Sequence, residues 1–255
     1  MTFDADLTAC AALVEKADPE RFAATMVSPP SARPVLFALY AFNVEVSRAP
    51  WVTAEPMIAE MRLQWWRDAL EEIGTGGPVR RHEVVTPLSR ILDAKGAEIL
   101  DQLVAARRWD IGKDAFEDAA HMAEYLDRTA AGLMWVAARA LCPDISGDAA
   151  TEARVRRAGH AAGLARFLRA VPALEAAGRI PMVDGRPGVI AALAAEALAG
   201  SKHPGGLPRA ARPALTEAFA ARDILSQAAR DPVRVAEGTL ALSPLKRSFR
   251  LWQWS

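Results

Sequence analysis

The sequence predicts an all-α protein, and three observations support this fold class. Ala, Leu, Glu and Arg dominate the long segments, and these residue types favour helices. No segment alternates Val, Ile, Thr or Tyr with polar residues, which is the pattern of a half-buried strand. Gly and Pro cluster between the apolar-periodic segments, where they end one helix before the next begins.

The N-terminal part of the chain contains predicted helices with recognisable ends. Asp18 is placed to cap the first helix, which ends at the Ser-Pro-Pro stretch 28–30. The next helix carries Pro34 in its first turn, where proline is tolerated. A long amphipathic helix then runs from Pro56 to about Ile73, and the glycine-rich loop after it is a plain helix break.

Further helices are predicted along the rest of the chain, in what we expect to be one domain. Their ranges are 87–94, 97–109, 114–141, 149–177, 187–199 and 211–229. The Gly- and Pro-rich stretch 201–208 is the only candidate linker, but the segment after it is too short to build its own core. Residues 1–255 are therefore predicted to form a single domain.

The composition limits the compartment and the class of partner. Lys plus Arg (31) balance Asp plus Glu (31), so no basic field indicates a nucleic acid as partner. Cys10 and Cys142 are too few and too far apart for a disulfide framework, so we expect a reducing compartment, the cytoplasm. No stretch approaches the roughly 20 apolar residues that cross a bilayer, so any membrane contact should be peripheral, on the inner membrane face.

Patterns that suggest metal binding have simpler explanations here. Asp114 and Asp118 form an acidic pair at i and i+4, but they begin a predicted helix, where acids cap free N–H groups. The histidines lack the HxxxH or HExxH spacing of a zinc site; they are His82, His121, His160 and His203.

Four blocks of sequence resemble the squalene/phytoene synthase family in order and spacing. They are PVLFALYAFNVEVSRAPWVTAEPMIAEMRLQWWRDAL at 34–70, YLDRTAAG at 125–132, GLARFLR at 163–169, and Gly178-Arg179. The resemblance covers most of residues 18–183. It implies a single-domain isoprenoid synthase helical bundle, whose helices enclose a deep apolar cavity.

The resemblance also implies which acids the family's chemistry requires. In that family two aspartate-rich motifs on facing helices hold magnesium ions against a prenyl diphosphate. On this chain, the aspartates of the first motif fall on Ser47, Arg48 and Trp51, and those of the second fall on Ala170 and Leu174. No acid stands at these positions. We therefore expect no metal site and no cofactor, with magnesium required only if the chain were an active synthase.

The same alignment predicts a cationic and narrowed cavity. The asparagine of the second motif falls on Arg166, so Arg48 and Arg166 are expected to face one cavity mouth and to repel a divalent cation. Trp51, Phe167 and Leu174 are expected to narrow the cavity. Glu45 could be shifted into the first motif, but a lone glutamate is a poor magnesium site and a solvated helix-face acid is the favoured interpretation.

Four side chains are candidates for substrate binding at this cavity mouth: Arg62, Trp66, Arg169 and Arg179. Arg62 and Trp66 share a helical face and could line the mouth, although core packing with the arginine stem over an indole is favoured. Arg169 and Arg179 match family positions near the diphosphate. They could hold the anionic head group of a lipid or prenyl ligand without any metal.

Two hypotheses of function follow from the resemblance. The favoured one is a non-catalytic family member similar to the complex I assembly factors of mitochondria and their bacterial relatives, which share the LYAFN and RLQWWR stretches and lack the aspartates. Its partner would be a membrane-bound respiratory assembly intermediate. The alternative is a head-to-head prenyl transferase that makes squalene or phytoene. The missing aspartates favour the first hypothesis.

Two surfaces are candidates for docking to such a partner or to a membrane. One is the aromatic and basic tail 243–255, although packing of this tail on the bundle is the favoured interpretation. The other is the arginine-rich face of the helix predicted at 149–177, which carries Arg154, Arg156 and Arg157.

Overall fold

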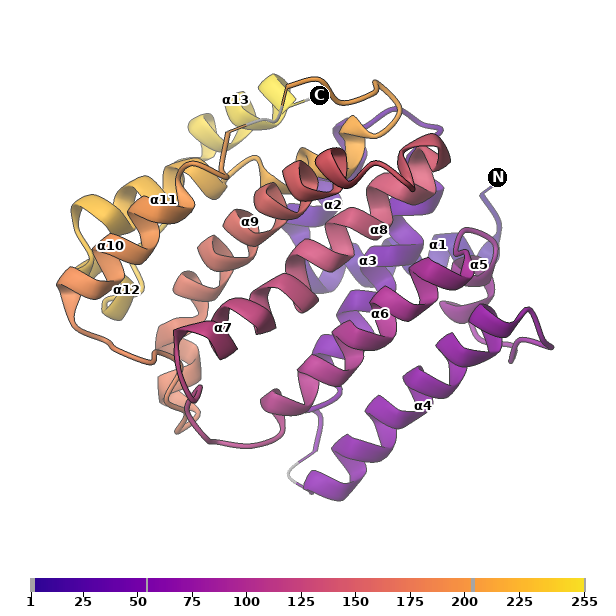
Figure 1. The fold of residues 1–255 in the computed structure, drawn as a ribbon, viewed down its shortest axis with the longest axis horizontal. Helices are drawn as coiled ribbons and strands as arrows, with labels where there is room; N and C mark the ends of the chain where they lie inside the picture. The colour runs from indigo at the N-terminus through magenta and orange to yellow at the C-terminus, as the bar shows by residue number, and fades with distance from the viewer. Residues whose placement is uncertain (1–2, 54, 203–204, 255) are drawn as a thin grey trace.

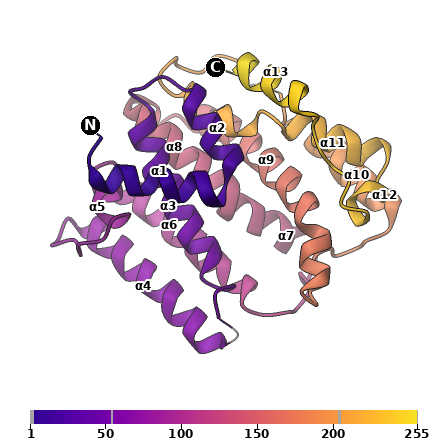
Figure 2. The ribbon, with the colours of Figure 1, turned by 180° about the vertical axis from the view of Figure 1, so that it is seen from behind.

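The computed structural model describes residues 3–53, 55–202 and 205–254, and within these ranges it contains helices and no strand. The predicted all-α fold is confirmed. The first helices are α1 (Ala5–Ala17), α2 (Pro19–Val27), α3 (Arg33–Arg48) and α4 (Pro56–Thr75). Figure 2 shows α1 and α2 crossing one face of the molecule in front of α3.

Helix α1 was not predicted, although its sequence carries the signals of a helix. The side chain of Asp4 accepts a hydrogen bond from the Leu7 N–H at 3.0 Å and so caps the first turn. Leu7, Cys10 and Val14 lie at helical spacing, are fully buried and pack toward α3. The predicted cap at Asp18 is confirmed, because its side chain accepts from the Arg21 N–H at 3.0 Å.

The middle of the chain departs from the predicted boundaries. It forms α5 (Val85–Ser89), α6 (Ala94–Ala106), the 3-10 turn η1 (Arg107–Asp110), α7 (Ala119–Leu126), the π-helical turn η2 (Asp127–Ala131) and α8 (Gly132–Leu141). The helix predicted from Asp114 begins instead at Ala119, because Asp118 is the capping residue and accepts from the His121 N–H at 2.8 Å. Asp114 lies in the preceding loop and is not a cap.

The C-terminal part of the chain contains the longest helix of the described residues, α9. Its elements are η3 (Pro143–Ile145), α9 (Ala149–Ala176), α10 (Pro187–Ala197), η4 (Arg212–Ala218), α11 (Ala221–Arg230), α12 (Val233–Ala236) and α13 (Pro244–Trp254). The helix predicted at 211–229 is thus divided into a 3-10 turn and α11. His203 lies outside the described residues.

The helices α4, α6, α8, α9 and α11 follow one another across the molecule, each in contact with the next (Figure 1). Gly163 of α9 allows a close approach to η2, since a Cβ there would lie 2.5 Å from the Cβ of Ala130. One apolar core runs through these layers. Within the described ranges, no helix combines the length and the apolar character needed to span a membrane.

Candidate functional site

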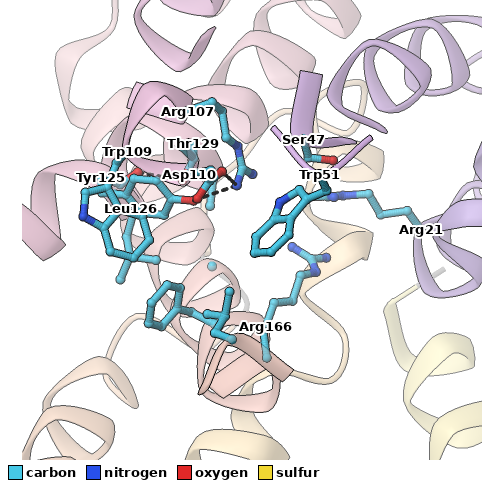
Figure 3. A pocket seen from close by; sticks show the side chains of 15 residues that line it. Arg21, Ser47, Trp51, Arg107, Trp109, Asp110, Tyr125, Leu126, Thr129 and Arg166 are labelled. Atoms are coloured by element: carbon cyan, nitrogen blue, oxygen red, sulfur yellow. Dashed lines mark hydrogen bonds and ion pairs between the residues drawn. The ribbon is translucent and has the colours of Figure 1, made fainter. Parts of the chain in front are cut away.

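A cavity of about 340 Å³ lies between α3, η1, η2 and α9 (Figure 3). Its apolar wall consists of Leu126, Ala130, Gly163, Phe167, Ala170 and Leu174. Figures 1 and 2 place the α3–α4, η1–α7 and α9–α10 connections together at the lower end of the molecule. Trp51, Trp109 and Leu174 come from these connections or from the helix ends beside them, so the cavity opens at this end.

Four of the five positions aligned with the two aspartate-rich motifs meet in this cavity. Ser47 and Trp51 line it from the end of α3 and the loop after it, and Ala170 and Leu174 line it from α9. The Ser47 hydroxyl donates to the carbonyl of Val44 at 3.0 Å, so its hydrogen is used within the helix. None of the four positions offers a carboxylate to the cavity.

Both Arg48 and Arg166 were expected to face the cavity mouth. Arg166 lines the cavity, but Arg48 does not. The Arg48 side chain is half-exposed, and its guanidinium lies 3.6 Å from Glu45 on the outer side of α3. The reason is helical phase, because Arg48 lies about 100° around the helix axis from Ser47 and is turned away from the face that lines the cavity. Glu45 is accordingly the ion-pair partner of Arg48 and not a cavity acid.

A buried ion network closes the cavity on the side of α2 and η4. Glu217 of η4 accepts from the guanidinium groups of both Arg21 and Arg166, and its distance to Arg166 is 3.0 Å. The second partner of Arg21 is Asp18, at 3.0 Å. Burial by itself would lower the pKa of Arg21, but the charges of Glu217 and Asp18 outweigh it and raise that pKa. Arg21 is therefore a permanent cation at the cavity wall.

A second network covers the opposite wall. The Arg107 guanidinium donates to Asp110 at 3.0 Å and to the Tyr125 hydroxyl at 2.7 Å, and that hydroxyl donates to Asp110 at 2.9 Å. Burial raises the pKa of Tyr125, so the phenol stays protonated. Arg179 donates to the Asp110 carbonyl, and its guanidinium lies 4.2 Å from the centre of the Trp51 ring. This stacking places Arg179 directly behind the cavity wall.

Arg62 and Trp66 lie outside the cavity. Arg62 is exposed on α4, while Trp66 is buried and packs edge-to-face on Phe42 with 5.4 Å between ring centroids. Neither Arg62 nor Trp66 lines the cavity mouth, contrary to the prediction. Arg169 also faces away from the cavity and pairs with Glu20 at 2.9 Å.

Sequence reasoning missed Arg21, Arg107, Asp110 and Glu217. Three of these charged side chains, Arg21, Asp110 and Glu217, are buried. Charges at buried positions are retained only when they are paired, so this pattern could have indicated a buried network. It could not have identified the partners.

The cavity residues do not fit the magnesium ions that the family's chemistry requires. Among the described residues that line the cavity, Asp110 is the one carboxylate, and it is already held by Arg107 and Tyr125. No cluster of three or more His, Cys, Asp or Glu side chains suited to a metal occurs in the described part of the chain. Hard divalent cations prefer several oxygen ligands, which this wall does not supply.

A helical bundle with a cavity between these helices is the architecture of the isoprenoid synthases. A dehydrosqualene synthase in complex with ligand superposes with a TM-score of 0.78 at 17% identity, covering 98% of this chain and 95% of that chain. Residues 14–182 match the squalene/phytoene synthase model, and the chain belongs to this family.

The chain is also similar in sequence to two complex I assembly factors. The complex I assembly factor 6 homolog of Drosophila melanogaster is 33% identical over 172 residues, which is 64% of this chain and 50% of the relative. Complex I assembly factor 6 of Homo sapiens is 26% identical over 177 residues, 64% of this chain and 48% of the relative. The chain thus spans about half the length of the relatives that it matches.

Proposed function

We propose that this chain is a non-catalytic family member that acts in the assembly of respiratory complex I. The observation that carries the proposal is the cavity itself, where Ser47, Trp51, Ala170 and Leu174 occupy the motif positions and provide no metal ligand. The similarity to assembly factors of an insect and a mammal supports the same role.

The alternative, prenyl transfer, is disfavoured by charge. Without magnesium, departure of the diphosphate lacks the ion that would stabilise it, and Arg107 and Arg166 beside the cavity repel such an ion.

Helix α13 is the docking surface that we assign to the partner. Its outward side exposes Leu245 (86%), Phe249 (52%) and Trp252 (71%), which share one helical face at i, i+4 and i+7. Its inward side buries Leu251 and places Arg250 2.6 Å from Asp223 of α11. The tail therefore both packs on the bundle and offers an apolar face, which suits a membrane-bound intermediate at the inner membrane face.

On the arginine-rich face of α9, Arg154 and Arg156 are engaged within the chain, whereas Arg157 is exposed. Arg156 is paired with Glu152 at 2.6 Å and with Asp127 at 3.1 Å, and Arg154 donates to the hydroxyl of Thr151 at 2.7 Å. Charges that are already paired within the chain gain little from a partner, because the existing pairs must first be broken.

The decisive experiment is deletion of the gene in its own organism. We expect membranes of the deletion strain to lose NADH dehydrogenase activity and assembled complex I on native gels, with rescue by the wild-type chain. Normal complex I in the deletion strain would overturn the proposal. As a check on chemistry, the purified chain should release no diphosphate from farnesyl diphosphate with magnesium, whereas an active synthase would.

A further inference from the structure

We propose that the outward face of α4 binds an amphipathic helix of a partner protein, one that is apolar in one half and basic in the other. The inference goes beyond the proposed function, since it names a second surface and the kind of partner segment that fits it. Figure 1 shows α4 along one edge of the molecule and α13 along the opposite edge, so both surfaces can be occupied at once.

Helix α4 has an uncovered face. It packs mainly on α6, with smaller contacts to α3 and η1. Residues that recur every three or four positions mark the other side, and we call them the α4 stripe: Met57, Met61, Gln64, Asp68, Glu71 and Thr75. This spacing keeps the side chains on one side of a helix, and all of them except the half-buried Asp68 are exposed. The stripe spans about 27 Å, the length of a partner helix of about five turns.

The N-terminal half of the α4 stripe is apolar. Met57 is 76% exposed and Met61 66%, and Ile58 beside them is 45% exposed. A cluster of exposed apolar side chains marks an interaction site, unlike a single one. Methionine suits such a contact, because its flexible thioether adapts to the shape of the partner.

The C-terminal half of the α4 stripe is acidic. In the described part of the chain, neither Asp68 nor Glu71 forms an ion pair, and Asp68 accepts from the neutral amide of Gln64 at 2.8 Å. The nearby cations in the sequence, Arg67 and Arg80, are each held by a different carboxylate. A lysine or arginine of a partner would therefore meet two acids that are not yet paired.

A groove of about 390 Å³ between α4 and α6 runs beside this acidic half. Its floor includes the small or apolar residues Leu70, Gly74 and Ala97. The described residues that line it include three carboxylates and one cation, Arg67. The stem of a lysine or arginine can lie along such a floor while its charged end reaches the rim. The groove therefore favours a basic partner segment.

A membrane surface fits the α4 stripe less well than a helix does. A helix that lies on lipid is apolar along its whole face, whereas here Asp68 and Glu71 follow the apolar half. These acids would repel the anionic head groups that attract basic segments. Glu55 and Arg62, which flank the apolar half, have opposite charges and add no net attraction for lipid.

The test is calorimetric titration of the purified full chain with synthetic helical peptides of about 18 residues. One kind carries leucines at helical spacing in one half and lysines in the other, and it is made in both sequence directions. The second kind has glutamate in place of lysine. We expect saturable binding of at least one lysine peptide and at least about tenfold weaker binding of the glutamate peptides. Absence of binding by both lysine peptides, or equal affinity for the two kinds, would overturn the proposal.

Matched variants locate the contact. Asp68→Lys with Glu71→Lys should reverse the preference, so that a glutamate peptide binds at least about tenfold more tightly than the lysine peptides. Met57→Ser with Met61→Ser should weaken binding of the lysine peptide by about tenfold or more, since its leucines lose their apolar contact. Glu15→Lys is the control, because Glu15 is an exposed acid on α1 without an ion pair in the described chain. Unchanged binding by either double variant would contradict the proposal.

Light scattering of the free chain tests another occupant, α13 of a second copy, which is also apolar and basic. We expect a monomer. Self-association that is lost both on truncation after Ser243 and in the methionine variant would assign the α4 stripe to a second copy and overturn the partner helix.

The outcome can be separated from that of the proposed function. Peptide binding by a chain whose deletion leaves complex I normal would keep the α4 stripe and overturn the assembly role. A chain that rescues complex I in the deletion strain but binds no peptide would do the reverse.

Discussion

The cavity wall and helix α13 use the same residue types, arginine and tryptophan, in opposite ways. In the wall, Arg21 and Arg166 converge on the buried Glu217, and their neighbours leave donors without acceptors. On α13, Arg250 is paired with Asp223 at the bundle surface, and the aromatic side chains face outward. In the first region, charges are therefore buried and held by one another. In the second region the ion pairs hold the helix on the bundle, and an apolar face stays exposed.

The largest expected effect comes from removing the shared acid of the wall. Glu217→Ala leaves Arg166 without its carboxylate and Arg21 with Asp18 alone, so we expect a loss of about 3 kcal/mol in the free energy of unfolding. Urea denaturation followed by circular dichroism measures it. Glu98→Ala is the control, because Glu98 pairs with Lys95 on the surface and should cost under about 1 kcal/mol. Equal losses in the free energy of unfolding for the two variants would show that the buried network contributes no more than a surface ion pair.

Truncation after Ser243 tests the other region and should have a smaller effect on stability. The chain loses the buried Leu251 and the partners of Asp223, which we expect to cost about 1–3 kcal/mol while unfolding stays cooperative. Association with native membranes should be abolished. An unfolded product would mean that α13 belongs to the core, and a folded product that still rescues the deletion strain would remove the docking role.

Changing the outward face of α13 alone should leave the fold almost untouched. The double variant Leu245→Ser and Phe249→Ser alters exposed side chains, so the free energy of unfolding should change by less than about 0.5 kcal/mol. Co-sedimentation with native membranes should fall to the level of the truncated chain. Retained co-sedimentation would place the docking surface elsewhere on the molecule.

The smallest expected effect is the pH dependence of α13 packing. Burial would raise the pKa of Asp223, but hydrogen bonds from Arg250 and Lys246 outweigh it and lower that pKa below 3.8. Because the folded pKa is depressed, the contribution to stability is full above 3.8 and is lost as the pH falls through the folded value. A fluorophore at Leu245→Cys should report release of α13 only below this pH. The same label in D223N should report looser packing already at neutral pH.

Much of the fold could be read from the sequence because helix signals are local. An aspartate cap predicted the start of α2, at Asp18, and the predicted helix 149–177 matches α9 to within one residue. The same rule wrongly predicts a helix start at Asp114. The chain first forms a loop there, in which Phe116 stacks on Trp109 with 3.9 Å between ring centroids. That contact joins residues on both sides of a turn, and a local pattern does not reveal it.

The candidate site was predictable in part. Family spacing brought Ser47 and Trp51 to the same cavity as Ala170 and Leu174. Adjacent positions on one helix face different ways, however, so Arg48 and Arg169 point outward while Arg166 lines the cavity. A motif alignment assigns positions along a helix, whereas the rotation of that helix about its axis depends on what it packs against.

The sequence by itself determined the all-α class, the family, and the absence of acids at the aligned motif positions, since these depend on residue type and order. Only the tertiary structure decided which arginines surround the cavity and which acids hold them. Arg21 and Glu217 stand 196 residues apart, and the sequence around each residue does not indicate the other as its partner. Buried charges are stable only in pairs, and the members of a pair meet only after the helices that carry them have packed.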